Sequence, residues 1–356
     1  MRETKPRISD VGSMNIMAKS LLVSVNNALF YSFSLLLLLP SASARAPRWP
    51  NPPVKPEIRH RPTWKPQGLS PALLSRLPND TWDSHMHNID PARYPLASDA
   101  AYTPSGHSLW DAVSFENSVS MKNIVVVQPS IYGNDNTALL DALRGLGPDR
   151  SRGVVVFDSE SIDNTTLKEW HELGVRGVRL NLASTDEDPD PEAFARTLRD
   201  YTAIIKPFGW TLQVYMSMDM MPTLAPTFRD LDVKVCFDHF AQPTMPNTTQ
   251  SAGPFDPYTI NGFADFIELL KEGNTWVKFS APYRVDLTAD QLDVMAREIL
   301  AVRNDRVVYA TDWPHTRFEG LDIRPFEARC LEWAEDAKCV DKVFSTNAHQ
   351  LWDISR

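Results

Sequence analysis

From residue 80 onward the chain repeats one pattern of apolar and polar positions. A short run rich in β-branched and aromatic residues is followed by a turn and then by an amphipathic stretch of helical period. The pattern predicts eight strands, at Thr81–His87, Asn123–Ser130, Gly153–Phe157, Gly177–Asn181, Thr211–Ser217, Val233–Phe240, Trp276–Ser280 and Arg306–Thr311. It predicts helices between them, including Thr137–Leu146, Thr165–Leu173, Pro191–Pro207, Ile260–Glu272 and Thr288–Val302.

This alternation predicts the fold class. Strands that alternate with helices indicate parallel βαβ units, and eight units in residues 79–356 favour an α/β fold, a single (β/α)8 TIM-type barrel. A doubly wound open sheet is the alternative, but it calls for a Gly-rich turn after the first strand, where the chain reads Asn88-Ile-Asp-Pro-Ala. Long connections at 88–107 and 241–258 follow the first and sixth strands, and barrel active sites are built from such loops.

Composition and charge divide the chain in two. The 43% hydrophobic and 23% charged residues are typical of a soluble protein, and the net charge of -9 argues against a nucleic-acid partner. Residues 1–78 nevertheless carry 11 Lys and Arg against 3 Asp and Glu, whereas residues 79–356 carry 25 against 42. Ten of the 28 prolines lie between Pro40 and Pro78. The first 78 residues are therefore expected to lie outside the barrel.

The N-terminal part has the pattern of a targeting segment. The apolar stretch Ala28–Leu39 precedes Ala42 and Ala44, which form the small-x-small pattern of a signal-peptidase site. Residues 1–44 are predicted to be a signal peptide, or else a signal anchor that makes the only membrane contact, and 45–78 a proline-rich basic tether. Localisation in the secretory pathway or outside the cell follows, with a cytoplasmic protein as the alternative if translation starts downstream.

Sequons and cysteines add little to this prediction. The sequons that a secreted glycoprotein would use lie at Asn79, Asn164 and Asn247. The cysteines, too few for a disulfide framework or a zinc cluster, are Cys236, Cys330 and Cys339. A buried, inert thiol is expected at Cys236, and a bridge between the other two remains open.

The candidate chemistry gathers where predicted strands end. Residues two apart on a strand share a face, so Asp83, His85 and His87 on the first strand are expected to point the same way. The sixth strand ends at His239 and the eighth at Asp312. The ends of parallel strands meet at one mouth of a barrel, so these groups are predicted to converge there.

Basic and hydroxyl side chains follow the same strand ends. Arg179 closes the fourth strand and Arg284 follows the seventh, and a guanidinium in a cleft can bind a substrate carboxylate through two N–H groups. Tyr215, Ser130 and Tyr132 are further candidates for lining a substrate pocket. For these three, a packing role is an equal alternative.

Several short motifs occur in order along the predicted barrel. They are Asp83-Ser-His-Met-His87, Asp90-Pro-Ala-Arg-Tyr-Pro95, Gln128-Pro-Ser-Ile-Tyr-Gly133, Arg176-Gly-Val-Arg-Leu-Asn181, Asp238-His239, Val277-Lys-Phe-Ser280 and Thr311-Asp-Trp-Pro-His315. This ordered set resembles the amidohydrolase-related proteins, in particular the branch of 2-pyrone-4,6-dicarboxylate lactonase. The resemblance implies a (β/α)8 barrel that hydrolyses a lactone or a similar ester, with more distant relatives that are metal-dependent decarboxylases.

The resemblance also implies a role for each candidate. Asp312 would be the general base that activates water for attack on the lactone carbonyl. Three histidines would polarise that carbonyl and stabilise the oxyanion, namely His85, His87 and His239. Arg179 and Arg284 would hold substrate carboxylates and orient the ring.

Two departures from the family pattern refine these expectations. The fifth strand, Thr211–Ser217, lacks the histidine of metal-using relatives, which favours catalysis without a required cofactor; a single divalent metal such as zinc, on His85, His87 and Asp312, is the alternative. The segment 182–188, after the fourth strand, is acidic. It suggests that the substrate carries fewer carboxylates than a pyrone dicarboxylate, or carries them at other positions. We expect a small, anionic, carboxylated or polyhydroxylated lactone as substrate. The alternatives are a metal-dependent decarboxylase of an aromatic or enol acid, and a non-catalytic binding barrel.

Overall fold

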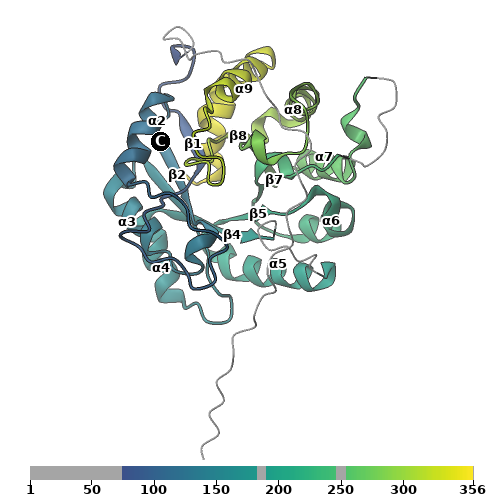
Figure 1. The fold of residues 1–356 in the computed structure, drawn as a ribbon. Helices are drawn as coiled ribbons and strands as arrows, with labels where there is room; N and C mark the ends of the chain where they lie inside the picture. The colour runs from purple at the N-terminus through teal and green to yellow at the C-terminus, as the bar shows by residue number, and fades with distance from the viewer. Residues whose placement is uncertain (1–73, 183–189, 246–253, 356) are drawn as a thin grey trace, which may run out of the picture. The chain divides into compact units, whose positions relative to one another are not determined.

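The computed structural model describes residues 74–182, 190–245 and 254–355. Its eight strands are β1 (Trp82–Met86), β2 (Asn123–Val127), β3 (Ser151–Val155), β4 (Val175–Asn181), β5 (Thr211–Tyr215), β6 (Val235–Phe237), β7 (Thr275–Phe279) and β8 (Val307–Tyr309). They form one parallel sheet in sequence order, with helices around the outside (Figure 1). The predicted leader, 1–44, lies outside the described residues.

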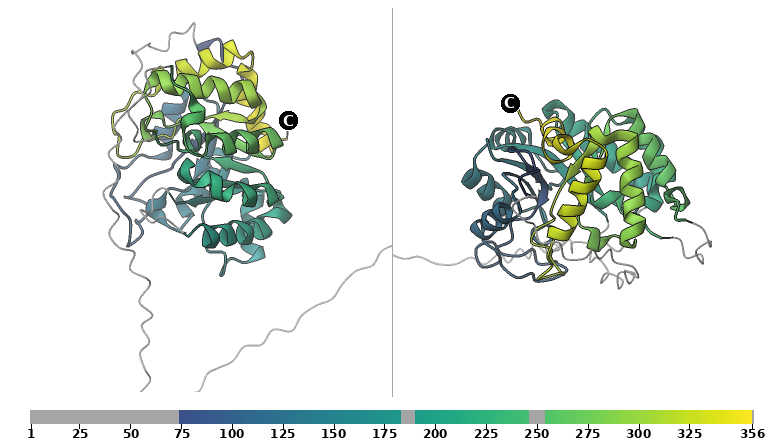
Figure 2. Two further views of the ribbon diagram at one scale, coloured as in Figure 1. Left: turned by 90° about the vertical axis from the view of Figure 1, so that its right-hand side faces the viewer. Right: turned by 90° about the horizontal axis from the view of Figure 1, so that it is seen from above.

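Helices connect successive strands and cover the sheet. They are α2 (Leu109–Ser118), α3 (Thr137–Leu146), α4 (Asn164–Leu173), α5 (Pro191–Ile205), α6 (Met221–Asp230), α7 (Phe263–Glu272), α8 (Ala289–Arg303), α9 (Arg324–Asp336) and α10 (Asn347–Leu351). The further views show these helices lying outside the strands (Figure 2). The helix starts predicted at Pro191 and Thr288 are confirmed, since Asp190 caps α5 and Thr288 forms a capping box with Gln291.

The barrel closes through the ends of β1 and β8. The backbone N–H of His87 donates to the carbonyl oxygen of Trp313 at 2.8 Å, and that of Asp312 donates to His85 at 2.8 Å. The eight strands therefore make a TIM barrel, as predicted. Closure at this point also brings two histidines of β1 next to the carboxylate that follows β8.

The floor of the barrel is closed by the C-terminal segment. The indole of Trp352, fully buried, packs in an apolar cluster with residues of β1, β2, β3, β6, β7 and β8. Its Nε1 donates to Ser84 Oγ at 3.2 Å. A Cβ at Gly177 would lie 2.9 Å from the carbonyl oxygen of Thr211 and 3.5 Å from the Trp352 ring, so only glycine fits there. The active mouth must therefore lie at the opposite end.

The three cysteines are free and buried. Burial raises the pKa of the Cys236 thiol to about 12, which agrees with the inert role expected for it. The bridge left open between Cys330 and Cys339 is not formed. Among the described residues, no helix combines the length and the apolar character that crossing a membrane needs.

Candidate active site

Asp312 stands at the centre of the barrel mouth and is almost fully buried. Its Oδ2 accepts hydrogen bonds from Tyr283 Oη and Arg284 Nε, each at 2.7 Å. Burial opposes ionisation, but the guanidinium of Arg284 and the neighbouring histidines outweigh it and hold the pKa of Asp312 well below its ordinary value. The carboxylate is thus ionised and fixed by one oxygen, while the other oxygen is turned to the histidines.

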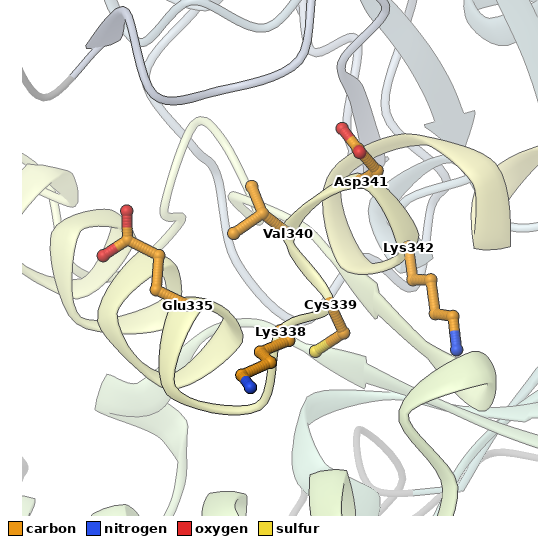
Figure 3. A pocket seen from close by; sticks show the side chains of 6 residues that line it. All are labelled: Glu335, Lys338, Cys339, Val340, Asp341 and Lys342. Carbon is orange, nitrogen blue, oxygen red and sulfur yellow. The ribbon is translucent and has the colours of Figure 1, made fainter.

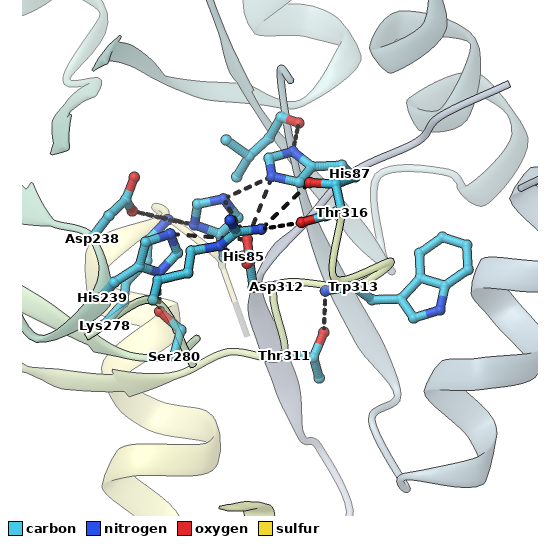
Figure 4. Close-up of polar contacts among 12 residues, drawn as sticks. His85, His87, Asp238, His239, Lys278, Ser280, Thr311, Asp312, Trp313 and Thr316 are labelled. Carbon is cyan, nitrogen blue, oxygen red and sulfur yellow. Dashed lines mark hydrogen bonds and ion pairs between the residues drawn. The ribbon is translucent and has the colours of Figure 1, made fainter. Parts of the chain in front are cut away.

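The Oδ1 atom of Asp312 faces the Nε2 atoms of three histidines. The distances are 3.5 Å to His87, 3.7 Å to His85 and 3.9 Å to His239. The convergence predicted for strand ends β1, β6 and β8 is therefore present in the structure (Figure 4). These separations are longer than direct hydrogen bonds, so the four groups surround a small space.

The tautomer of neutral His87 is set by its backbone partner. Its Nδ1 lies 2.7 Å from the carbonyl oxygen of Val127, which can only accept a hydrogen bond. Nδ1 therefore carries the proton, and Nε2 presents a lone pair to the space in front of Asp312. A neutral His87 cannot donate to a substrate carbonyl from this position.

His85 belongs to a fully buried network around Asp238. The Nδ1 of His85 lies 3.2 Å from Asp238 Oδ1 and 3.3 Å from Lys278 Nζ. Burial opposes ionisation of Asp238, but Lys278, His85 and Arg179 outweigh it and hold its pKa well below the ordinary value. Gln213 also donates to both oxygens, at 2.9 and 3.0 Å. Asp238 is thus saturated and positions the ring of His85.

Two proton arrangements of His85 satisfy this network. If Nδ1 donates to Asp238, the Nε2 lone pair joins those of His87 and Asp312, and three acceptors converge. If Lys278 donates to Nδ1, the Nε2 proton donates to His87 Nε2, 3.3 Å away. The first arrangement suits a cation in front of Asp312, whereas the second joins the two rings by a hydrogen bond without one.

The donor set of the first arrangement fits a divalent metal. His85 Nε2, His87 Nε2 and Asp312 Oδ1 are separated by 3.3, 3.5 and 3.7 Å. Tetrahedral zinc with bonds of about 2.0–2.1 Å has ligands roughly 3.3–3.4 Å apart. The second group of nearby donors, His85 with Asp238 and His239, fits less well because the Asp238 oxygens are occupied by cations and amides.

His239 lies in a left-handed turn at the end of β6. Four successive residues, from His239 to Gln242, have φ between 50° and 59°, a region that costs a non-glycine residue roughly 1–2 kcal/mol. The Nδ1 of His239 lies 2.8 Å from Ser280 Oγ, and its ring stacks on that of His85. Burial lowers the pKa of His239 to about 4, so the ring is neutral. Such local strain is typical of functional sites.

Asp83 does not join this group, and the prediction that it shares a face with His85 is wrong. The pairing of β1 with β2 shifts register between Asp83 and Met86, which interrupts the alternation of faces. Asp83 instead accepts hydrogen bonds from the backbone N–H groups of His85 at 2.9 Å and Thr311 at 3.0 Å. It ties β1 to the end of β8.

Both predicted arginines are engaged with carboxylates of the chain itself. Arg179 Nε donates to Asp238 at 3.0 Å, and Arg284 Nε donates to Asp312 at 2.7 Å. Arg284 also donates through Nη2 to the carbonyl oxygen of Thr316 at 3.1 Å. Binding of a substrate carboxylate by these two side chains stays a prediction.

A polar pocket opens in front of these groups. It is lined by His87, Tyr102, Pro129, Ser130, Arg179, Asn181, Tyr215, His239, Arg284, Asp312, Thr316 and Arg317. Tyr132, also predicted to line it, is not among them, because its hydroxyl accepts from the backbone of Asp90 at 2.9 Å and its ring packs in a separate apolar cluster. The Tyr215 ring lies edge-on to His239, with centroids 4.8 Å apart.

Several polar residues of the site were not singled out from the sequence, among them Lys278, Tyr283, Tyr102 and Arg317. Lys278 holds Asp238, Tyr283 holds Asp312, and Tyr102 and Arg317 line the pocket. Lys278 gave a signal, since a lysine inside the apolar run of β7 needs an ionic partner. The others lie in irregular segments after β1, β7 and β8, where the spacing of residues does not predict which way a side chain points.

Another cavity lies between the end of α9 and the following turn (Figure 3). It is lined by Glu335, Lys338, Cys339, Val340, Asp341 and Lys342. It contains none of the histidines, and its thiol is buried with a pKa raised to about 11 by burial. We therefore place the active site at the barrel mouth.

The fold and the site define a barrel hydrolase, and comparison with known proteins agrees. Residues 82–354 match the family model described as amidohydrolase. The chain therefore belongs to the amidohydrolase family, as the motifs predicted.

Individual relatives show which members of the family the chain resembles. A 2-pyrone-4,6-dicarboxylate hydrolase of Comamonas testosteroni is 30% identical over 294 residues, which cover 78% of this chain and 91% of the relative. A 4-sulfomuconolactone hydrolase of Hydrogenophaga intermedia is 26% identical over 258 residues, covering 70% and 79%. The crystal structure of an amidohydrolase of Burkholderia multivorans with bound zinc superposes with a TM-score of 0.56, at 20% identity and covering 78% and 100%. The chain is thus similar to enzymes named for opening lactones.

Proposed function

We propose that this protein hydrolyses a small lactone at the mouth of its barrel. The observation that carries the proposal is Asp312, whose carboxylate is fixed through Oδ2 by Arg284 and Tyr283 while Oδ1 faces the histidines. Two relatives named as lactone hydrolases support the same reaction class. A lactone needs an attacking water, a base for its proton and a group that stabilises the oxyanion.

The base is Asp312. A water bound at Oδ1 transfers a proton to that oxygen as it attacks the lactone carbonyl. The depressed pKa of Asp312 keeps the carboxylate ionised before attack. When the carbon–oxygen bond of the ring breaks, the proton held by Asp312 passes to the ring oxygen, which leaves as an alcohol or enol, and the carboxylate of Asp312 is restored. The other product is a carboxylic acid, which ionises in water. The ion pair with Arg284 keeps the second oxygen from rotating away.

The neutral histidine best suited to stabilise the oxyanion is His239. Ser280 Oγ lies 2.8 Å from its Nδ1, so a hydroxyl proton donated there leaves the imidazole proton on Nε2. That nitrogen lies at the pocket, 3.9 Å from Asp312 Oδ1. In its neutral form His87 cannot take this role, because the bond to Val127 places its single ring proton on Nδ1. The three equivalent histidines of the sequence hypothesis therefore divide into one donor and two supporting rings.

A divalent metal is compatible with this scheme. His85, His87 and Asp312 would hold it, and when bound it would polarise the lactone carbonyl as a Lewis acid. Catalysis without a metal stays the prediction from the fifth strand, and it corresponds to the arrangement in which His85 donates to His87. The metal-dependent decarboxylase remains the alternative function because the donor set fits a metal.

Substitution of Asp312 by asparagine tests the function. With the full-length protein and a panel of carboxylated, sulfonated and sugar lactones, Asp312→Asn should lower kcat by about 10²- to 10⁴-fold, as expected for loss of a general base. Asp336→Asn on the surface of α9 is the matched control and should keep full activity. Hydrolysis by the asparagine variant at the wild-type rate would reject the general base. Release of CO₂ without ring opening would favour the decarboxylase, and binding without turnover would favour the non-catalytic barrel.

For localisation, we propose that residues 1–44 direct the chain into the secretory pathway. The proposal rests on the apolar stretch Ala28–Leu39 and the small residues that follow it. Asn79 and Asn164 are exposed and so accessible to glycosylation, while Asn247 lies outside the described residues. N-terminal sequencing of the mature protein should begin near Arg45, and an N-terminus at Met1, Met14 or Met17 would contradict cleavage.

A further inference from the structure

The pocket contains an arginine that the chemistry above does not use. Three arginines line the pocket against one carboxylate, that of Asp312. Arg179 and Arg284 each pair with a buried carboxylate of the chain. The guanidinium of Arg317 has no ion pair and no side-chain hydrogen bond to any described residue; its contact is with the ring of Tyr102, whose centroid lies 4.4 Å from Cζ.

The fold holds Arg317 in this position. Its φ is 68°, in the left-handed region, and its backbone N–H donates to Glu319 Oε1 at 3.3 Å, so the segment after β8 turns at this residue. The next residue, Phe318, packs against Tyr283, with ring centroids 4.7 Å apart. Tyr102, whose ring contacts Arg317, comes from the long connection after β1. Stacking uses the face of the guanidinium and leaves its N–H edges free for a ligand.

The charge balance of the pocket selects the kind of ligand. Apart from its histidines, the lining carries three positive charges and one negative charge, although residues 79–356 have an excess of acidic side chains. Arg179 and Arg284 each donate through Nε to a carboxylate of the chain, whereas Arg317 is exposed and its guanidinium has no such partner among the described residues, so Arg317 is a further charge placed to bind a ligand from outside. Planar carboxylates and sulfonates are acceptors that match its N–H fork.

We propose that Arg317, stacked on Tyr102, binds an anionic substituent of the substrate, a carboxylate or a sulfonate, while the lactone carbonyl faces Asp312. The inference rests on the proposed function and narrows it, because it makes Arg317 the residue that selects charged lactones over neutral ones. It adds Arg317 to Arg179 and Arg284, whose binding of a substrate carboxylate stays a prediction.

Paired substrates test this selection. The probes are 2-pyrone-4,6-dicarboxylate, 4-sulfomuconolactone and the uncharged 2-pyrone-4,6-dicarboxamide. Arg317→Gln should raise KM by about 10- to 100-fold for whichever of the two anionic probes binds Arg317. This is the usual effect of losing a hydrogen bond to a charged group. KM for the dicarboxamide should change less than threefold. Arg317→Lys should lie between, since it restores charge without the fork, and Arg297→Gln on the surface of α8 is the control. The anion with the larger dependence on Arg317 identifies the substituent.

Outcomes of this experiment separate the two proposals. Equal changes for charged and uncharged lactones, or no change for any of them, would overturn the role of Arg317 while leaving lactone hydrolysis intact. If the wild-type protein opens none of the probes, the proposed function fails for these lactones, and the role of Arg317 is then judged by binding. In that case each anion should raise the Tm of the wild type and not of Arg317→Gln; the same shift in both proteins, or none in the wild type, rejects the inference.

Discussion

Arg284 Nε lies 2.7 Å from Asp312 Oδ2, and this pair joins the segment after β7 to the residue that follows β8. The arginine thereby controls the protonation of the base. Since the folded-state pKa of Asp312 is depressed, its contribution to stability is present above its ordinary value near 3.8 and is lost as the pH falls through the folded value. The same ion pair should set the acid limit of activity.

Replacing Arg284 by glutamine should therefore shift activity to higher pH. Loss of the guanidinium raises the pKa of Asp312, so the acid limb of kcat/KM should move upward, and the rate at pH 5 should fall more than the rate at pH 8. Arg284→Lys keeps the charge and should shift the limb less. pH–rate profiles of the three proteins measure the effect, and superimposable acid limbs would show that Arg284 does not control the base.

Metal content should distinguish the two arrangements of His85. If the site binds zinc, the full-length protein should contain about one zinc per chain by elemental analysis, and zinc should raise its Tm. His87→Ala, which removes one of the three donors, should lose both effects. The control is His171 of α4, which lies away from the site and accepts a hydrogen bond from Trp210. His171→Ala also removes an imidazole but should keep the bound zinc and the shift in Tm. Activity that survives chelation without bound metal would support the metal-free arrangement.

The buried carboxyl group of Glu327 should make stability depend on pH. It is fully buried on α9, and neither oxygen has a hydrogen-bond partner among the described residues. Burial, together with the charge of Asp83, raises its pKa well above the ordinary 4.5. The unfolded chain ionises first, so stability is full below about pH 4.5 and declines as the pH rises toward the folded value. Glu327→Gln should reduce this decline between pH 5 and 8, whereas the exposed Glu169→Gln should not. The prediction is contradicted if the free energies of unfolding of the wild type and Glu327→Gln change with pH in the same way across that range.

A surface substitution should stabilise the end of α9. Lys338 is exposed and has φ of 54°, in the left-handed region, while its N–H donates to the carbonyl of Glu335 at 2.9 Å (Figure 3). Glycine takes this conformation without strain, so Lys338→Gly should raise the free energy of unfolding by about 0.5–1 kcal/mol. Lys338→Ala keeps the strain and should give no comparable gain. Urea unfolding curves of the three proteins measure the difference.

The strand pattern predicted the fold because the strands are buried on both sides, completely in all but β4, whose Arg176, Leu180 and Asn181 are partly exposed. All eight predicted runs contain the observed strands to within two residues at their starts, and the helix at Thr137–Leu146 is reproduced at both ends. Prolines obscure other helices, such as α6, which contains Pro226 in its interior. The groups at strand exits were predictable for the same reason, since the fold alone brings His85, His239 and Asp312 together.

The remainder of the site depends on features that spacing does not encode. The register shift in β1 turns Asp83 away from the histidines, although the alternation of residues predicted otherwise. The roles of the arginines depend on which carboxylate each one meets, and the partner of Arg179 lies 59 residues further along the chain. A sequence pattern identifies such a side chain but does not identify its partner.

The position of Trp352 has a consequence for the order in which the chain is made. The indole that closes the barrel floor, near the Nζ of Lys278 at 5.2 Å, follows the last strand, β8, along the chain. It is therefore synthesised after all eight strands. Until then the lower half of the barrel is not closed, so a chain that stops just before Trp352 should aggregate or be degraded although every catalytic group has been synthesised.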